Sequence, residues 1–359
     1  MNGLIKSLSF SLALALTVSA GLISCGGGDG DGGQNGGETT TINGRVADVM
    51  TANAPSEKKT SMLALIKDFL SLSKKANAQA SAVSGITVEL IVDGETVDTD
   101  ITDEEGNFTL SLTSSATTNI TLVFITDEFS ASTEITSPPG SIINIVVTLN
   151  PDEVIVDEME VEGTIRCETG FVDISELGAD IVVDGGGVDD CIRVEGNCVL
   201  NVESGSLILT NCQRCIDAGG TAELTIISGY ISCDSTEDGI RARGTSATVS
   251  LATTDDISVT SGANGIRAEG NSTLSLDAEG NINISGEENG IRAEGNSTTT
   301  LSAGENIDIS GNENGIRAEG TSTVDVSALG ECTIFGSDSP IREDGVPTVD
   351  VGNCLLIGP

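Results

Sequence analysis

The sequence predicts an all-β protein: a right-handed parallel β-helix of about seven coils, preceded by a small β-sandwich. The first observation is a phrase, Asn-Gly-Ile-Arg-Ala-Glu-Gly, that occurs at a constant step, at 264–270, 289–295 and 314–320. The second is that its isoleucine recurs at nearly the same step, at Ile192, Ile216, Ile240, Ile266, Ile291, Ile316 and Ile341. A period of about 25 residues is typical of solenoids. The third is a composition of 38% hydrophobic but only 2% aromatic residues, which suits a narrow core of small side chains.

Each period holds two further runs in which apolar residues alternate with small polar ones. Thr273–Asp277 and Asn281–Ser285 follow the phrase at 264–270. This alternation is the period-two signature of a half-buried strand, and the Gly, Asn, Asp and Glu residues between the runs favour turns. Three short strands in each period make one coil of a β-helix, so we assign residues 165–359 to this domain.

The N-terminal segment 1–25 predicts export. Lys6 precedes an apolar run from Leu12 to Ile23, and Leu22-Ile23-Ser24-Cys25 resembles the lipobox of bacterial lipoproteins. The resemblance implies cleavage before Cys25, acylation of its thiol, and a lipid-anchored chain at the bacterial outer membrane or cell surface. Residues 26–41, rich in Gly and Asp, are expected to be a flexible tether.

Residues 42–150 have the texture of a small β-sandwich. Strands are expected at Ile42–Val46, 85–94, 102–110, 119–125 and 142–149. Their order, and the run Thr-Asp-Glu-Glu-Gly-Asn-Phe at 102–108, resemble the carboxypeptidase regulatory-like domain, a transthyretin-like fold whose presence implies a structural or stalk role. A basic insertion at 56–82 carries Met62, Ile66 and Phe69 at helical spacing. We expect a helix on a membrane surface, with a helix against the sandwich or a partly disordered insert as the alternatives. We expect a linker at 151–164.

Eight cysteines besides Cys25 predict disulfides, because an even number is typical of an oxidising compartment. Cys167, Cys191 and Cys215 follow one another at the period of the repeat and are expected in one column of adjacent coils. Cys212 and Cys233, like Cys332 and Cys354, are separated by roughly one coil; Cys198 completes the set. Disulfides between neighbouring coils are expected at both ends of the solenoid, with their connectivity left open. Zinc binding by Cys212 and Cys215 is disfavoured because the chain has no second such pair and no histidine.

The formal net charge of −39 excludes nucleic acid as a partner, because so acidic a chain repels phosphates. The charged residues of the repeat nevertheless follow a pattern. In Ile-Arg-Ala-Glu the Ile and Ala point inward, so the Arg and Glu point outward and stack from coil to coil. The predicted arginine column is Arg193, Arg241, Arg267, Arg292, Arg317 and Arg342. The predicted glutamate column is Glu195, Glu269, Glu294 and Glu319, which Glu343 extends.

Two interpretations of these columns stay open. The glutamates can neutralise the arginines in a surface network of ion pairs. Alternatively, an acidic polysaccharide can lie along the arginine column, held by bidentate contacts from the guanidinium groups. Acidic and amide side chains just before each anchoring isoleucine are then candidate calcium ligands, with simple solvation as the alternative. These candidates are Asp189, Asp190, Glu237, Asp238, Glu288, Asn289, Glu313 and Asn314.

The phrases at 238–242 and 289–295 resemble the repeats of a bacterial β-helix carbohydrate-binding domain whose architecture is related to pectate lyases. The resemblance covers about 165–359 and implies acidic sugars and calcium as ligands. Arginine stands where that family often has histidine. The resulting hypothesis is a cell-surface lipoprotein that binds acidic polysaccharide with the help of calcium. The alternative is a structural or adhesive spacer without a small ligand. No catalytic residue is assigned, because a catalytic site should interrupt the repeat and the coils at 264–320 are nearly identical.

Overall fold

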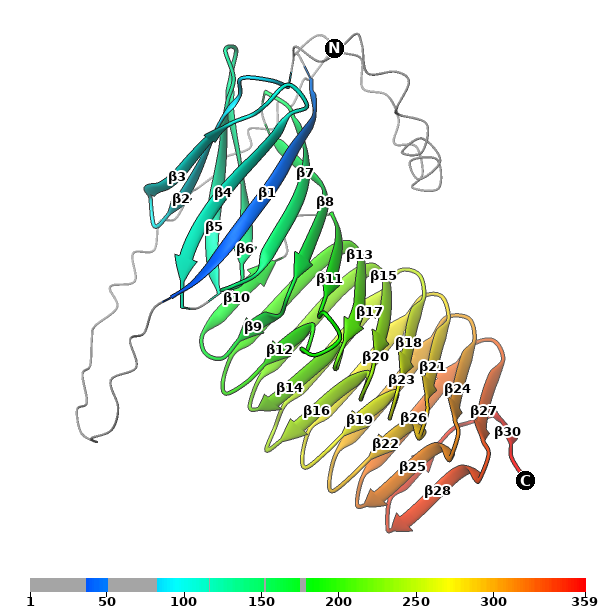
Figure 1. Ribbon diagram of the computed structural model, residues 1–359. Coiled ribbons are helices and arrows are strands. Elements are labelled where there is room, and N and C mark those ends of the chain that lie inside the picture. The colour runs from blue at the N-terminus through cyan, green and yellow to red at the C-terminus, as the bar shows by residue number, and fades with distance from the viewer. Residues whose placement is uncertain (1–36, 51–82, 116, 152, 175–178) are drawn as a thin grey trace, which may run out of the picture. The chain divides into compact units, whose positions relative to one another are not determined.

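The computed structural model describes residues 37–50, 83–115, 117–151, 153–174 and 179–359. The signal segment 1–25, the insertion 56–82 and most of the tether lie outside these residues. The described residues form strands and turns without a helix, so none of their segments is a helix long and apolar enough to cross a membrane. Figure 1 shows the strands of the C-terminal half following one another as stacked coils, which confirms the all-β parallel solenoid.

The N-terminal part contains two sheets that share a core. One is antiparallel, in the order β3-β2-β5-β6. In the other, β1 pairs with β4 and β7, and β7 pairs with β8. The rings of Phe108 in β4 and Phe124 in β5 meet edge to face with centroids 5.7 Å apart, which joins the two sheets. The strands are β1 (Glu38–Val49), β2 (Thr87–Val92), β3 (Glu95–Ile101), β4 (Asn107–Ser114), β5 (Thr118–Ile125), β6 (Ser130–Ser137), β7 (Ile142–Leu149) and β8 (Val154–Glu162).

Two sequence-based boundaries are wrong here. Strand β1 begins at Glu38, inside the expected tether, because its first residues pair with β4. The expected linker at 151–164 contains β8, whose alternating Val and Met residues are buried while its acidic residues face outward. Strand β8 pairs with β7 of the sandwich and in parallel with β11 of the solenoid, so this segment belongs to the sheets.

The solenoid has three ladders of parallel strands. The first ladder holds the repeated phrase and its weaker copies in eight strands, one more than the expected seven coils. It consists of β9 (Ile165–Cys167), β12 (Ile192–Val194), β14 (Ile216–Gly220), β16 (Ile240–Gly244), β19 (Ile266–Ala268), β22 (Asn289–Ala293), β25 (Asn314–Gly320) and β28 (Ser339–Gly345).

Two long strands, β13 (Val199–Cys212) and β15 (Glu223–Ser235), each run through the second ladder and on into the third. The other strands of the second ladder are β10 (Phe171–Ile174), β17 (Thr248–Thr253), β20 (Thr273–Ala278), β23 (Thr298–Ala303), β26 (Thr323–Ala328) and β29 (Thr348–Asp350). Those of the third are β11 (Asp180–Asp184), β18 (Ile257–Ser261), β21 (Ile282–Gly286), β24 (Ile307–Gly311), β27 (Cys332–Gly336) and β30 (Leu355–Ile357).

The last glycine of the phrase makes the turn out of the first ladder. In coil after coil it has a positive φ, for example 73° at Gly270 and 75° at Gly295 and Gly320. Residues with side chains rarely adopt this conformation, whereas glycine does so without steric cost. The repeated glycine therefore fixes the corner that carries the chain from the first ladder to the second.

The expected disulfides are present, with two corrections. The pairs are Cys167–Cys198, Cys191–Cys212, Cys215–Cys233 and Cys332–Cys354. Cys191 and Cys215 share a column, but Cys167 stacks beside Val194, because the first coil is longer than the others. Cys212 and Cys233 each bond to the cysteine that opens their own coil, so these two disulfides lie within a coil and not between neighbouring coils as expected. The pair Cys332–Cys354 joins adjacent coils as expected.

Candidate functional site

The arginines of the phrase form a column on the first ladder. Strand register places Arg241, Arg267, Arg292, Arg317 and Arg342 side by side in successive coils. In the same register Arg193 lies beside Arg166, which the repeat pattern did not identify. The expected stacking is therefore confirmed, with one added arginine and one interruption. The interruption is Asp217, which occupies the arginine position between Arg193 and Arg241.

Carboxylates two residues further along each strand pair with these arginines. Within one coil, Arg267 contacts Glu269 at 2.6 Å, Arg317 contacts Glu319 at 2.7 Å, and Arg292 contacts Glu294. Contacts also cross to the next coil: Arg241 lies 3.0 Å from Glu269. Two longer contacts of this kind are Arg267–Glu294 at 3.8 Å and Arg292–Glu319 at 3.5 Å. The last coil differs from expectation, since Asp344, rather than Glu343, aligns with Glu319 and pairs with Arg342 at 2.9 Å.

We use the name Arg–Glu network for the arginines of this column and their carboxylate partners: Arg241, Arg267, Arg292, Arg317, Arg342, Glu269, Glu294, Glu319 and Asp344. Its guanidinium and carboxylate groups are half-buried, with 22–28% of each side chain exposed between Arg241 and Glu319. The aliphatic stems of the arginines therefore lie along the sheet while part of each charged group meets solvent. Each arginine from 241 to 317 in this column already has at least one carboxylate partner. The network can neutralise its own charge without a ligand.

The coil that starts at Cys215 inverts the charge pattern. Asp217 stands in the arginine column, and Arg243 stands in the glutamate column of the following coil. Arg214 precedes the phrase at a position where most other coils carry Asp or Asn. Arg243 donates hydrogen bonds of 3.0 and 2.9 Å to Asp217 and one of 2.8 Å to Glu195. Arg214 lies 3.0 Å from Asp190. The charges at these three irregular positions therefore neutralise one another, with Asp190 and Glu195 of the preceding coil as further partners.

Burial and charge move the pKa values of the two buried aspartates apart. Burial acts to raise the pKa of Asp217, but the hydrogen bonds and positive charge of Arg243, together with Arg214, hold it below its usual value. Burial raises the pKa of Asp190, and Arg214 offsets this only in part because Asp217 and Glu237 add negative charge. The hydrogen bond to Asp217 likewise raises the pKa of Arg243.

Four of the proposed calcium ligands lie inside the solenoid rather than on its surface. Asp190, Asp238, Asn289 and Asn314 are all at most 5% exposed. From Asp238 onward the side chains form an asparagine ladder. The Asn264 amide donates to Asp238 at 2.7 Å, Asn289 donates to Asn264 at 2.8 Å, and Asn314 donates to Asn289 at 2.8 Å. Asp238, Asn289 and Asn314 are thus bonded between coils, whereas Asp190 pairs with Arg214 and the Oδ1 atom of Asn314 is left without a hydrogen-bond partner among the described residues.

The other four candidates, Asp189, Glu237, Glu288 and Glu313, are exposed. Glu237 accepts a hydrogen bond from Gln213 at 2.8 Å and lies 3.6 Å from Arg214. Among the residues that the structure describes, no three His, Cys, Asp or Glu side chains are placed to hold a metal ion together. Calcium binding therefore stays a prediction without a defined site.

A second asparagine ladder runs through the turn between the second and third ladders, and sequence reasoning missed it. Asn281 donates to Asp256 at 2.9 Å, Asn306 donates to Asn281 at 3.0 Å, and the backbone N–H of Glu331 donates to Asn306 at 2.7 Å. The available signal was an Asp or Asn recurring at the solenoid period before Ile257, Ile282 and Ile307. Both ladders begin with an aspartate. Its ionised carboxylate only accepts hydrogen bonds, so it needs no acceptor in the preceding coil.

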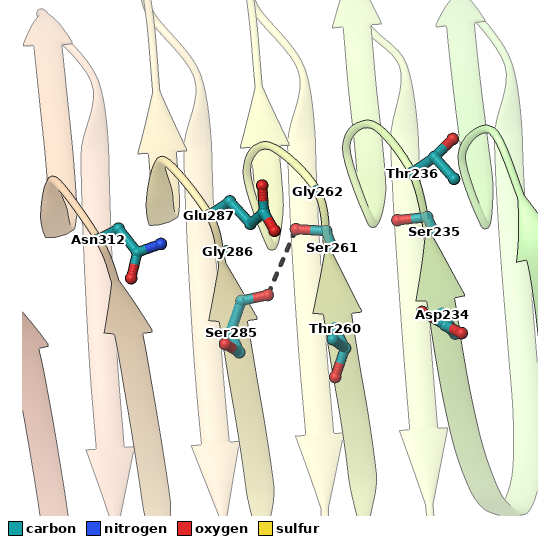
Figure 2. Close-up of a pocket in the computed structure, with 10 residues that line it drawn as sticks. All are labelled: Asp234, Ser235, Thr236, Thr260, Ser261, Gly262, Ser285, Gly286, Glu287 and Asn312. Atoms are coloured by element: carbon teal, nitrogen blue, oxygen red, sulfur yellow. Dashed lines mark hydrogen bonds between the residues drawn. The ribbon is translucent and has the colours of Figure 1, made fainter.

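A shallow polar groove of ≈ 550 Å³ crosses the turns that lead out of the third ladder. Figure 2 shows hydroxyl, carboxylate and amide groups of four successive coils around it, including Asp234, Ser261, Glu287 and Asn312. The Oγ atom of Ser235 is buried there without a hydrogen-bond partner. Its lining contains no basic side chain, so this groove is unsuited to an acidic sugar.

Comparisons with known proteins found no match: no family model, no curated protein and no solved structure is similar to this chain. The three resemblances described under Sequence analysis therefore rest on the quoted residues alone.

Proposed function

We propose that the chain is a surface lipoprotein whose solenoid serves as a stiff structural spacer. The observation that carries this proposal is the internal pairing of the Arg–Glu network. The arginines from 241 to 317 are occupied by carboxylates of their own or the next coil. The contacts that tie coils together are the ones that cross to the next coil: Arg241–Glu269, Arg267–Glu294 and Arg292–Glu319. A surface pair contributes under about 1 kcal/mol, but the pairs act together along the ladder.

Two further features support a rigid spacer. The asparagine ladders link successive coils by side-chain hydrogen bonds that are buried in the first ladder and partly buried in the second, and the disulfides hold the first coils and the last. A solenoid whose neighbouring coils are joined in this way resists bending, and each added coil extends it by about 4.8 Å, the spacing of paired strands. Attachment of the chain through Cys25 is part of the proposal and rests on the sequence.

Binding of an acidic polysaccharide is the second candidate. The observation that favours it is that the guanidinium groups of Arg267, Arg292 and Arg317 remain 22–25% exposed and repeat once per coil. A linear polymer of matching period could reach several of them, with or without calcium bound at the exposed carboxylates. The neighbouring glutamates and the net charge of −39 oppose such a ligand.

One triple variant separates the two candidates. Arg267, Arg292 and Arg317 are replaced by Gln, and the full chain is measured for thermal stability and for binding to an array of anionic glycans with and without calcium. The spacer proposal expects a lower melting temperature for the variant and no glycan signal for either protein. An unchanged melting temperature, together with calcium-dependent glycan binding that is lost in the variant, would show instead that the column is a ligand site.

A further inference from the structure

The second ladder presents a regular array of hydroxyl groups to solvent. Strand register aligns one column of threonines, one per coil from β17 to β29: Thr248, Thr273, Thr298, Thr323 and Thr348. Two residues further along the strands, a second column holds Ser250, Ser275 and Thr300. We call these two columns the hydroxyl array.

The array points outward because its residues alternate with the core. Between Thr248 and Ser250 lies buried Val249, and between Thr273 and Ser275 lies buried Leu274. The side chains of the array are half-buried or exposed. Their spacing follows from the sheet: about 4.8 Å between coils and about 6.7 Å along a strand, twice the rise per residue.

The hydroxyls of the array are free to bond to water. Within the described residues none of them bonds to another protein group, although other hydroxyls of the same coils do. Ser272, Ser297 and Ser322, for example, donate to backbone carbonyls of neighbouring coils. Threonine is stiff at χ1, so stacked threonines in a parallel ladder hold their hydroxyl and methyl groups at fixed positions.

The face is also unusually free of charge for this chain. Of the twelve outward positions in β17, β20, β23 and β26, nine carry a hydroxyl and one is Ala252. The two others are Asp277 and Asp325. In these strands the face has no basic group to hold an anion and no aromatic ring to stack on a sugar. What it offers is a rigid, nearly neutral, two-dimensional grid of hydrogen-bonding groups and methyls.

We propose that the hydroxyl array binds ordered water, and specifically the surface of ice. An ice crystal presents water oxygens in a fixed two-dimensional repeat, and the array presents hydrogen-bonding groups in a fixed two-dimensional repeat set by the sheet. Each hydroxyl contributes little, but a rigid grid that meets a rigid crystal engages many sites at once, as in multivalent binding. Adsorption of this kind blocks the growth of the crystal. This activity is independent of the Arg–Glu network, which lies on another ladder.

The test measures ice recrystallisation with the full chain. Frozen droplets are annealed just below the melting point, and ice grain size is followed against protein concentration. The substitutions Thr298→Tyr and Thr273→Tyr place a bulky ring in the middle of the array, and Thr298→Val removes one hydroxyl at constant shape. The matched control is Thr260→Tyr, which adds the same ring at an exposed threonine of the third ladder.

The wild-type chain and Thr260→Tyr are expected to keep the grains small. Each tyrosine substitution in the array should raise the required concentration by at least about tenfold, because one protrusion separates many sites from the ice at once. Thr298→Val should cause a smaller loss. Melting temperatures of all variants should agree, since surface substitutions away from special features change stability little. Normal grain growth with the folded wild-type chain overturns the proposal. So does an equal loss in Thr260→Tyr, or retention of the chain by insoluble glycans without any effect on ice.

Discussion

Arg243 donates two hydrogen bonds to the buried carboxylate of Asp217, one coil before it, at 3.0 and 2.9 Å. The two residues exchange the charges that the repeat normally assigns to their columns. The side chain of Asp217 is 1% exposed, whereas that of Arg243 is about one-third exposed. The hydrogen bonds from Arg243 therefore replace the water that the Asp217 carboxylate loses on burial. The pair marks the boundary between the disulfide-bonded first coils and the near-identical coils that follow.

Replacing Asp217 by Asn should destabilise the protein by about 3 kcal/mol at neutral pH, because it leaves Arg243 and Arg214 without their shared buried carboxylate. The pKa of Asp217 is lower in the folded than in the unfolded chain, so its contribution is present above the unfolded value of 3.8 and is lost as pH falls through the folded value. Chemical denaturation of both proteins at neutral pH and in acid well below the unfolded value measures this. The difference between them should shrink at the lower pH; a constant difference would contradict the ion-pair account.

Replacing Asn289 by Ala should destabilise the solenoid by about 2–4 kcal/mol, because two buried polar groups lose their partners. The substitution leaves the oxygen of Asn264 without its donor and the amide of Asn314 without its acceptor. Asn283→Ala is the matched control, because Asn283 is exposed in the third ladder and has no bond to the asparagine ladder. Thermal unfolding of the two variants tests the idea. Equal stability of both variants would show that the asparagine ladder contributes nothing to the free energy of unfolding.

Replacing Thr299 by Val should stabilise the protein by about 1–3 kcal/mol, because valine keeps the shape and removes the cost of burying an unpaired hydroxyl. Thr299 is fully buried between Leu274 and Val324, and its hydroxyl has no hydrogen-bond partner. The neighbouring Thr298→Val serves as control, since that hydroxyl faces water. The melting temperature should rise for the first variant only, and a fall would indicate a hydrogen bond that the buried hydroxyl makes in solution.

Removal of the Cys332–Cys354 disulfide should loosen the last coil. This bond ties β30 to β27 at the open end of the solenoid, where Leu355, Leu356 and Ile357 are largely exposed. Replacement of both cysteines by Ser should cost about 2–4 kcal/mol. Hydrogen exchange should accelerate in β28, β29 and β30 first, because among the described residues each of these strands pairs with the preceding coil alone. Loss of protection spread evenly over the whole solenoid would contradict this order.

The solenoid could be predicted almost completely from the sequence because its period is carried by residues with unambiguous preferences. The Ile and Ala of the phrase are buried in each coil from Ile240 to Ala318, and the closing glycine takes the positive φ that side chains disfavour. The first ladder and the arginine column followed directly. The predictions were wrong where the repeat changes. The first coil is longer than the others, so Cys167 aligns with Val194 and not with Cys191. Strand β8 lacks the phrase, so its residues were assigned to a linker.

The sequence by itself determined which residues recur and therefore which residues stack. Only the tertiary structure decided what the stacked groups do. Asn289 and Glu288 are neighbours in the chain and both suggested a calcium ligand, yet one is buried in a ladder and the other is exposed. Likewise, the repeat by itself shows only that three positions depart from it: Asp217, Arg243 and Arg214. The tertiary structure places Asp217 in contact with both arginines. The physical reason is that a period specifies position along a column, whereas burial and charge pairing depend on the coils above and below.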